Sequence, residues 1–296
     1  MFKNLSASAL AITGHQSEII ELALTYGFRG IDVNIQEFTT RVKDHGMPYA
    51  RRLIDSARLQ VGRFQLPCSW EVKDADFEKE LNHLAAAAAA AAEIGCTRCL
   101  ATIEPASDER PYHENFEFHR RRFSEIGKKL EPAGLRLGLG FRATEKPRKG
   151  KAFQFIHDFD ALSTLVNMVA EPNVGILLDV WELYVSGGSI DNIRGLNAEQ
   201  IVAVQLADLP SDEPLDAVTE ADRLLPGATG RIDSTAILAL LKAKGYDGPV
   251  TIKASRRAFT TSRRDEIVRQ AGGALDTVWQ AAGLPSEPRF SPRSAG

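Results

Sequence analysis

The chain has 296 residues, and 36 lysines and arginines against 39 aspartates and glutamates give it a formal net charge of −3 at pH 7. Hydrophobic residues make up 44% and charged residues 25% of the sequence, the ordinary proportions of a globular protein with its own core. This charge balance argues against a nucleic-acid partner, and no stretch reaches the roughly 18 apolar residues that a membrane helix needs. With 3 cysteines and no apolar signal segment at its start, we expect a cytoplasmic protein.

Short β-rich runs alternate with longer segments of helical periodicity along the chain. The predicted strands are residues 5–12, 30–35, 61–66, 97–104, 135–141, 174–180, 201–206 and 249–254. The predicted helices are residues 17–26, 48–58, 74–94, 114–130, 159–169, 233–244 and 265–282. Glycines that follow helical runs mark helix ends at Gly27, Gly95, Gly134 and Gly245.

Runs that are apolar on both faces and alternate with helices indicate a parallel sheet covered by helices. Eight such runs fit a single α/β domain, a (β/α)8 TIM barrel. The alternative, an open doubly wound sheet, would carry a glycine-rich phosphate turn after its first strand, and none follows Ile12. We therefore predict one barrel domain over residues 1–285. Residues 286–296, rich in Pro, Ser and Arg, are predicted to be a disordered or surface-draped tail.

Functional side chains of such a barrel lie at the carboxyl ends of the strands and in the loops that follow. The candidates, in chain order, are His15, Asp32, Asn34, Gln65, Glu104, Gly140, Arg142, Asp179, Trp181, Glu182, Gln205, Asp208, Lys253, Ser255 and Arg256. Asp179, Gln205 and Lys253 are the most informative. Each is a polar residue at the end of an otherwise apolar run and therefore needs a partner.

Six segments, spread in order over most of the first 255 residues, carry a resemblance to a known family. They read IELALTYGFRGIDV, GLRLGLGF, NVGILLDVWELYVSGG, IVAVQLADLP, RLLPGATGRID and GYDGPVTIKA. On these segments the chain resembles the sugar-phosphate isomerase/epimerase family of xylose-isomerase-like barrels. The resemblance implies a TIM-barrel fold and an isomerase or epimerase activity that uses one divalent metal.

In typical members a Glu ending strand five, an Asp ending strand six, a His ending strand seven and a Glu ending strand eight hold the metal. These positions hold Gly140, Asp179, Gln205 and Lys253 here, and Glu182 replaces a further His that follows the strand-six Asp. Only Asp179 keeps the family residue. A divalent ion about 5 Å from the Lys253 ammonium would be repelled by roughly 6–7 kcal/mol at an effective dielectric constant of about 20. We therefore predict a degenerate metal site, no cofactor and the loss of metal-dependent isomerase activity.

The resulting prediction is a barrel that binds a small polyhydroxylated ligand of sugar or polyol type. In it, Lys253 lies where the family holds its metal, paired with Asp179 and hydrogen-bonded by Gln205. An equal alternative is that the ion pair of Lys253 and Asp179 is only structural and fills a metal site that has lost its function. Two further readings stay open. One is an active isomerase or epimerase that uses Asp179, Glu182 and Lys253 in a site that is either rebuilt, with Glu182 or Glu104 as a substitute metal ligand, or metal-free. The other is a non-catalytic binding or regulatory protein.

Other polar or aromatic residues of the predicted mouth are candidate ligand contacts. They are His15, Glu104, Arg142, Trp181, Gln205, Asp208, Arg223 and Arg256. Arg223 is included because residues 209–230 form a loop long enough to cover the mouth. The arginines at 256, 257, 263 and 264 either bind phosphate or form a basic surface patch. Homo-oligomerisation is left open.

Overall fold

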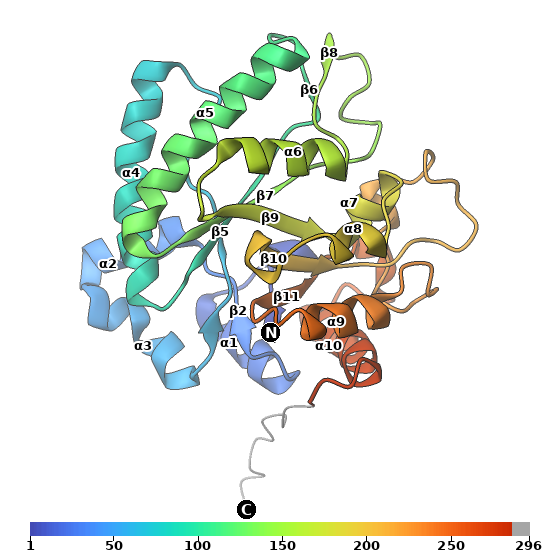
Figure 1. Ribbon diagram of the computed structural model, residues 1–296. Helices are drawn as coiled ribbons and strands as arrows, with labels where there is room; N and C mark the ends of the chain where they lie inside the picture. The colour runs from blue at the N-terminus through green and yellow to red at the C-terminus, as the bar shows by residue number, and fades with distance from the viewer. Residues whose placement is uncertain (286–296) are drawn as a thin grey trace, which may run out of the picture.

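Parallel strands form the centre of the computed structural model of the protein, which describes residues 1–285 (Figure 1). The strands of the main sheet are β1 (Phe2–Leu5), β2 (Gly30–Ile31), β3 (Gln60–Val61), β4 (Phe64–Gln65), β5 (Arg98–Thr102), β7 (Arg136–Gly140), β9 (Val174–Asp179), β10 (Ile201–Leu206) and β11 (Pro249–Ile252). Their order in the sheet is β3-β2-β1-β11-β10-β9-β7-β5-β4. The predicted tail, residues 286–296, lies outside the described residues.

The sheet closes into a barrel because its two outer members, β3 and β4, are pieces of one short extended run. On one side of this run, the Gly62 amide donates to the Ile31 carbonyl at 2.8 Å. On the other side, the Leu66 amide donates to the Leu100 carbonyl at 2.8 Å. The run therefore pairs with β2 and with β5, which confirms the predicted TIM barrel.

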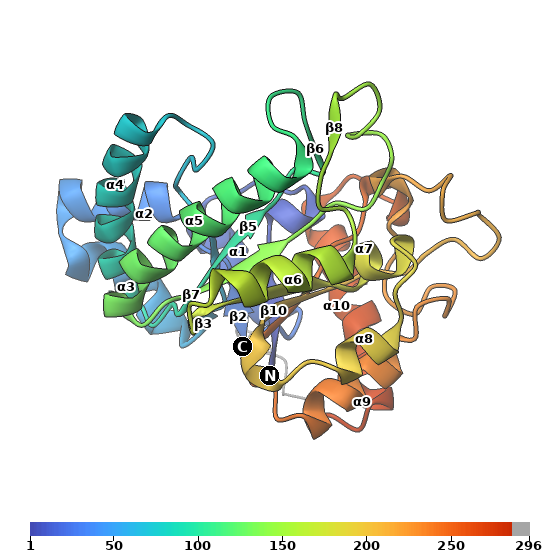
Figure 2. The ribbon, with the colours of Figure 1, turned by 45° about the horizontal axis from the view of Figure 1, so that its top comes forward.

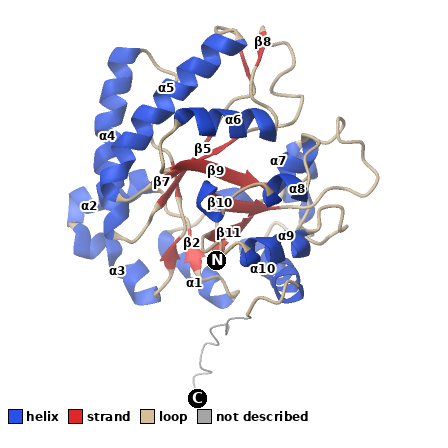
Figure 3. Ribbon diagram, in the orientation of Figure 1, coloured by secondary structure: helices blue, strands red, loops and turns tan. Residues whose placement is uncertain are grey.

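Helices surround the barrel, as Figure 3 shows in blue around the red strands. They are α1 (Gln16–Thr25), α2 (Ile35–His45), α3 (Met47–Ala57), α4 (Asp74–Glu93), α5 (Tyr112–Leu130), α6 (Phe159–Val169), α7 (Val180–Val185), α8 (Ile190–Arg194), α9 (Ser234–Ala243) and α10 (Arg264–Ala281). All four glycines predicted to mark helix ends have positive φ values, between 67° and 78°. None of the helices within residues 1–285 has the length and apolar character needed to cross a lipid bilayer.

The first two strands differ from the sequence prediction, and the helix α2 was not predicted. β1 spans Phe2–Leu5 instead of residues 5–12, because Phe2 and its neighbours pair with β11. The apolar residues beyond it enter the short 3₁₀ helix η1 (Ser8–Leu10) and bury Leu10 there. The predicted strand 30–35 ends at Ile31, because the Asn34 side chain accepts the backbone N–H groups of residues 36 and 37 and caps α2.

A small antiparallel ribbon lies outside the barrel and was not predicted. It pairs β6 (Ala106–Ser107) with β8 (Phe153–Gln154). Figure 2 shows both strands in loops that project from the barrel beside α5 and α6. Each strand has only two residues, too few for an alternation of apolar and polar residues to be visible in the sequence.

Candidate functional site

Neighbouring strands bring together, at one end of the barrel, the four positions that the resemblance assigns to metal ligands, called the four family metal-ligand positions below. Gly140 ends β7 and Asp179 ends β9. Gln205 lies in β10, in register with Asp179, and Lys253 follows the last residue of β11. Since β7, β9, β10 and β11 are consecutive in the sheet, their carboxyl ends form one arc of the mouth.

Asp179 is the centre of a charged cluster. Its side chain is 6% exposed. Its Oδ1 atom accepts from Arg223 Nη1 at 2.9 Å and from the backbone N–H groups that begin α7. Its Oδ2 atom accepts from Lys253 Nζ at 2.9 Å. Both carboxylate oxygens are therefore occupied by cations of the chain, and the predicted ion pair with Lys253 is present.

Arg223 links this carboxylate to Glu182. Its Nη2 atom donates to Glu182 Oε1, and its guanidinium lies over the ring of Trp181, 4.2 Å from the centroid. The second Glu182 oxygen accepts from the Ala143 amide at 2.8 Å. Asp179, Glu182, Arg223 and Lys253, called the charged cluster below, carry two formal negative and two formal positive charges.

Gln205 extends the charged cluster across the barrel to a second ion pair. Its amide satisfies both neighbours when the nitrogen donates to Asp179 Oδ2 at 3.0 Å and the oxygen accepts from Arg63 Nη1 at 2.7 Å. Arg63 Nε in turn donates to Asp32 Oδ2 at 2.9 Å. The hydrogen bond predicted between Gln205 and Lys253 is thus replaced by bonds to Asp179 and Arg63.

Arg63 is a residue that the sequence reasoning missed. Its side chain is 7% exposed and sits between two polar partners. It is a basic residue within the apolar run 61–66, so the rule that selected Asp179 would have selected it too. Attention to strand ends alone led to Gln65, which lies two positions further on.

Burial and neighbouring charges shift the two cluster carboxyls in opposite directions. Burial alone would raise the pKa of Asp179, but Arg223 and Lys253 outweigh it and hold that pKa below its ordinary value. The pKa of Glu182 is raised, chiefly by burial and also by the charge of Asp179, against the opposing effect of Arg223. Asp179 is therefore firmly ionised at neutral pH, whereas Glu182 holds a proton more readily than an exposed glutamate.

Three other predicted contacts lie around the charged cluster. Arg142 Nη2 donates to Glu220 at 2.7 Å, and its Nη1 donates to Glu104 at 3.4 Å, so this arginine joins two loops of the mouth. Trp181 is fully buried, and its ring packs against the guanidinium of Arg223.

Asp208 has a structural role that the sequence did not reveal. Its side chain is completely buried, and its two oxygens accept four backbone N–H groups at 2.8–2.9 Å. The donors are Leu209, Thr229, Gly230 and Ile232. Asp208 thus fastens both ends of the loop 209–232 and leaves no exposed oxygen for a ligand, which removes it from the candidate contacts.

His15 and the arginines of the predicted phosphate patch lie at the surface. His15 caps α1 and lines a shallow hollow formed with α2 and α3. Arg256 is exposed in the 3₁₀ helix η5 (Arg256–Ala258), next to Ser255. Its three neighbours in the predicted phosphate patch lie near carboxylates, in the pairs Arg257–Asp222 at 3.9 Å, Arg263–Asp265 at 3.1 Å and Arg264–Glu18 at 2.8 Å. These pairs favour the reading of a solvated basic surface.

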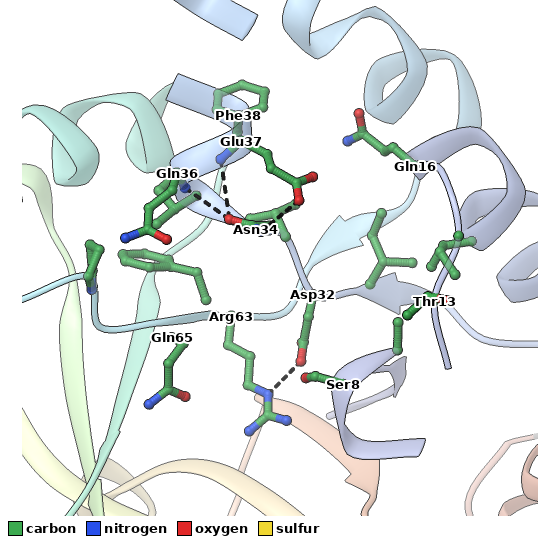
Figure 4. A pocket seen from close by; sticks show the side chains of 18 of the residues that line it. Ser8, Thr13, Gln16, Asp32, Asn34, Gln36, Glu37, Phe38, Arg63 and Gln65 are labelled. Atoms are coloured by element: carbon green, nitrogen blue, oxygen red, sulfur yellow. Dashed lines mark hydrogen bonds and ion pairs between the residues drawn. The ribbon is translucent and has the colours of Figure 1, made fainter. Parts of the chain in front are cut away.

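A cavity of about 760 Å³ opens beside the charged cluster, over the ends of β1, β2 and β4 (Figure 4). It is called the β1–β4 cavity below. Three sequence candidates line it: Asp32, Asn34 and Gln65. Arg63 lies next to Asp32 at its base.

The donor set at the four family positions does not fit a divalent metal. Gly140 supplies no side-chain ligand, Lys253 supplies a cation, and both oxygens of Asp179 already accept from cations. Within residues 1–285, no group of three or more His, Cys, Asp or Glu side chains is arranged to hold a metal ion. No step at this site is therefore assigned to a bound metal.

Comparisons with known proteins agree with this fold. The family model of the xylose isomerase-like TIM barrel matches residues 20–277. The inosose isomerase of Bacillus velezensis is 25% identical over 155 residues, 52% of this chain and 52% of that protein. The inosose isomerase of Bacillus subtilis is 26% identical over 148 residues, 50% of each chain. The chain thus matches about half the length of these curated relatives.

Solved structures extend the likeness over nearly the whole chain. A xylose isomerase domain protein from Alicyclobacillus acidocaldarius superposes with a TM-score of 0.84 and 25% identity, covering 95% of this chain and 99% of that one. The D-psicose 3-epimerase of Clostridium cellulolyticum, solved with D-tagatose, superposes with a TM-score of 0.73 over 95% and 99% of the two chains. At 14% identity, the second likeness concerns the fold alone.

Proposed function

The chain belongs to the family of xylose isomerase-like TIM barrels, and from this premise we propose that it binds a small polyhydroxylated ligand, of sugar or cyclitol type, without a divalent metal. Asp179 carries this proposal. The one family ligand that the chain retains has its two oxygens bound by Arg223 and by Lys253. The names of the relatives, inosose isomerase and D-psicose 3-epimerase, support the class of ligand.

Lys253 is the member of the charged cluster that is suited to contact a ligand. Its side chain is 34% exposed, whereas those of Asp179, Glu182 and Arg223 are 6%, 2% and 3% exposed. An ammonium group has three N–H donors, and one of them is directed to Asp179. The others are available to the carbonyl or hydroxyl oxygens of a sugar. Asp179 positions Lys253 by its hydrogen bond, and Arg223 in turn holds Asp179.

The same burial argues for binding rather than for metal-dependent isomerisation. Moving a proton next to a carbonyl needs a base within reach of the carbon acid. Glu182 has one oxygen on Arg223 and the other on the Ala143 amide, and Asp179 is held by two cations. We infer that the chain kept a ligand site of the family and lost the metal-dependent acid–base chemistry.

A second candidate function is a metal-free isomerase or epimerase that uses Asp179, Glu182 and Lys253. The raised pKa of Glu182 favours it, because burial often adjusts a carboxyl to accept and return a proton near neutral pH. This candidate requires the bond between Glu182 and Arg223 to open when ligand binds. Interconversion of an inosose or a ketohexose by protein treated with EDTA, and its loss in Glu182→Gln, would select it over simple binding.

The test of the proposal is elemental analysis of the purified protein together with calorimetric titration by Mn²⁺, Zn²⁺ and Mg²⁺. We expect no stoichiometric metal and no binding heat, because a 2+ ion near Lys253 is repelled by several kcal/mol, about 6–7 at 5 Å. Titration with a neutral sugar or cyclitol should give the same affinity before and after EDTA treatment. A tightly held metal in the native protein would overturn the proposal.

A triple variant tests the converse, that restoring the family residues restores metal binding. Gly140→Glu, Gln205→His and Lys253→Glu together restore the family residues, and we expect this variant to bind Mn²⁺ where the native chain does not. A Cβ at position 140 would lie 3.0 Å from a methyl group of Leu177, which must move by a few tenths of an ångström to admit the new side chain. The matched control carries Gly140→Glu and Gln205→His but keeps Lys253, and it should still reject the ion.

A further inference from the structure

We propose that the ring of the ligand occupies the β1–β4 cavity, where Gln65 contacts it, and that the charges of the cavity favour a neutral polyhydroxylated ring over a phosphorylated one. This inference rests on the proposed function and adds a place and a ligand charge to it. Gly140, Asp179, Gln205 and Lys253 do not line the cavity. The ring therefore lies toward β1, β2 and β4, and Lys253 would contact groups that extend from the ring toward the arc of β7, β9, β10 and β11.

The base of the cavity is a polar pair with capacity for further hydrogen bonds. The carboxylate of Asp32 accepts from Asn4 Nδ2 at 2.7 Å and from Arg63 Nε at 2.9 Å, one bond on each oxygen. Each carboxylate oxygen has a second lone pair, and the Asp32 side chain is 17% exposed. Figure 4 shows this pair between Gln65 and Ser8. Two adjacent hydroxyl groups of a ligand can donate to such a base.

The walls combine an apolar surface with a polar rim. Buried apolar residues line the cavity: Ile12, Ile35, Phe38 and Leu66. Exposed polar side chains, including Ser8, Thr13 and Gln65, line it as well. A sugar or cyclitol ring has C–H faces and a hydroxyl edge, which matches this division. The volume of about 760 Å³ falls in the range of small-molecule sites.

The charges in the cavity favour a neutral ligand. Asp32 and Glu37 balance Arg41 and Arg63, so the formal charge of the lining residues sums to zero. Arg63, the buried cation, already donates to Asp32 and to Gln205. A phosphate dianion would meet two carboxylates and one further cation, Arg41, which already donates to Gln16, whereas hydroxyl groups can donate to those carboxylates.

Gln65 lines the β1–β4 cavity and can report on a ligand bound there. Its amide offers both donors and an acceptor at the mouth, and its side chain is exposed at the end of β4. Gln60 provides a matched control, since it is the same residue type, also exposed, at the opposite end of the same barrel strand. Gln65→Ala and Gln60→Ala therefore differ in position along one strand and in little else.

The first experiment titrates the full chain and both variants with D-fructose, myo-inositol and D-fructose 6-phosphate. We expect at least one neutral probe to bind, and D-fructose 6-phosphate to bind more weakly than D-fructose. Gln65→Ala should weaken neutral binding by about three- to tenfold, the effect of losing one or two neutral hydrogen bonds, and Gln60→Ala should not change it. Tighter binding of the phosphate ester would overturn the inference about ligand charge.

A labelling experiment locates the ligand independently of affinity. The native thiols of Cys68, Cys96 and Cys99 are buried, and burial raises the pKa of Cys68 and of Cys96 to about 12 and that of Cys99 well above its ordinary value. They should react slowly with a maleimide. In Gln65→Cys the introduced thiol should react quickly, and a saturating neutral probe should slow it. Gln60→Cys should react at one rate with and without the probe.

The proposed function and the proposed position of the ligand would fail in different ways. If none of the three probes binds the native chain, the proposed polyol-binding function fails. If a probe binds, but neither Gln65→Ala weakens it nor Gln65→Cys is protected, the ligand lies elsewhere and this inference alone fails.

Discussion

Arg223 is the side chain on which the charged cluster most depends. It is 3% exposed and holds Asp179 and Glu182 at once. Replacing it with Met keeps the contact with Trp181 but leaves two buried carboxylates without their shared cation. We expect Arg223→Met to lower the free energy of unfolding by about 3–5 kcal/mol, the usual effect of removing one partner of a buried ion pair. Urea unfolding measures this change.

Arg256→Met is the control for this substitution, because Arg256 is exposed on η5. Its effect should remain within about 0.5 kcal/mol. A loss below about 1 kcal/mol in Arg223→Met would mean that the buried carboxylates find other partners, and would contradict the central place of this arginine.

Some residues of the site could be predicted from the sequence and others could not. Asp179 and Lys253 were predictable as a pair, because polar residues at the ends of apolar strands must meet a partner. Arg223 was predicted to contact ligand, yet it is buried between carboxylates. Its place depends on how the loop after β10 folds back to form the bridge between Asp208 and Leu224. Such a loop path has no periodic signal in the sequence.

At the scale of elements, one buried carboxylate determines the shape of the loop that carries Arg223. Asp208 accepts four backbone N–H groups from residues 209, 229, 230 and 232. Asp208→Ala would leave these donors without their partner, and we expect a loss of about 2–4 kcal/mol together with fast hydrogen exchange across residues 224–232. Asp212→Ala, an exposed position in the same loop, should change neither. Unchanged exchange in Asp208→Ala would show that the loop holds its shape through other contacts.

The elements that were predicted well are those whose neighbours bury them completely. β9 and β10 are buried at every residue, so their apolar runs fixed both their type and their bounds within a residue or two. The helix α2 was missed because the β-rich residues before it are followed at once by a helix that buries only Ile35 and Phe38. A short strand and a capped helix share one apolar run there, and periodicity alone cannot divide it.

For the whole molecule, the barrel connects residues that are remote in sequence into one polar network. Asn4 bonds to Asp32, Asp32 to Arg63, and Arg63 through Gln205 to Asp179 and the charged cluster. The network thus links strands from β1 to β11 across the mouth. In the proposed function it fills the region where the family holds its metal, and it borders the β1–β4 cavity.

This network makes stability depend on pH in a way that can be separated into two parts. The folded-state pKa of Asp179 lies below that of the unfolded chain, about 3.9. Its contribution to stability is therefore complete above about pH 5 and is lost as the pH falls through 3.9 toward the folded-state value. Glu182 acts in the opposite sense, because its pKa is raised on folding. Its contribution is complete below about pH 4 and declines as the pH rises through the folded-state pKa.

Urea unfolding of three proteins between pH 3 and pH 7 tests this division. Compared with the native chain, Asp179→Asn should lose stability less steeply as the pH falls below 4. The substitution removes a carboxyl that takes up a proton at higher pH in the unfolded state than in the folded state. Glu182→Gln should lose less stability as the pH rises from 5 to 7. Asp212→Asn, at an exposed position, serves as the control and should follow the native profile. Parallel profiles for Asp179→Asn and the native chain would mean that Asp179 titrates as an ordinary exposed carboxyl, which its two buried hydrogen bonds to Arg223 and Lys253 do not allow.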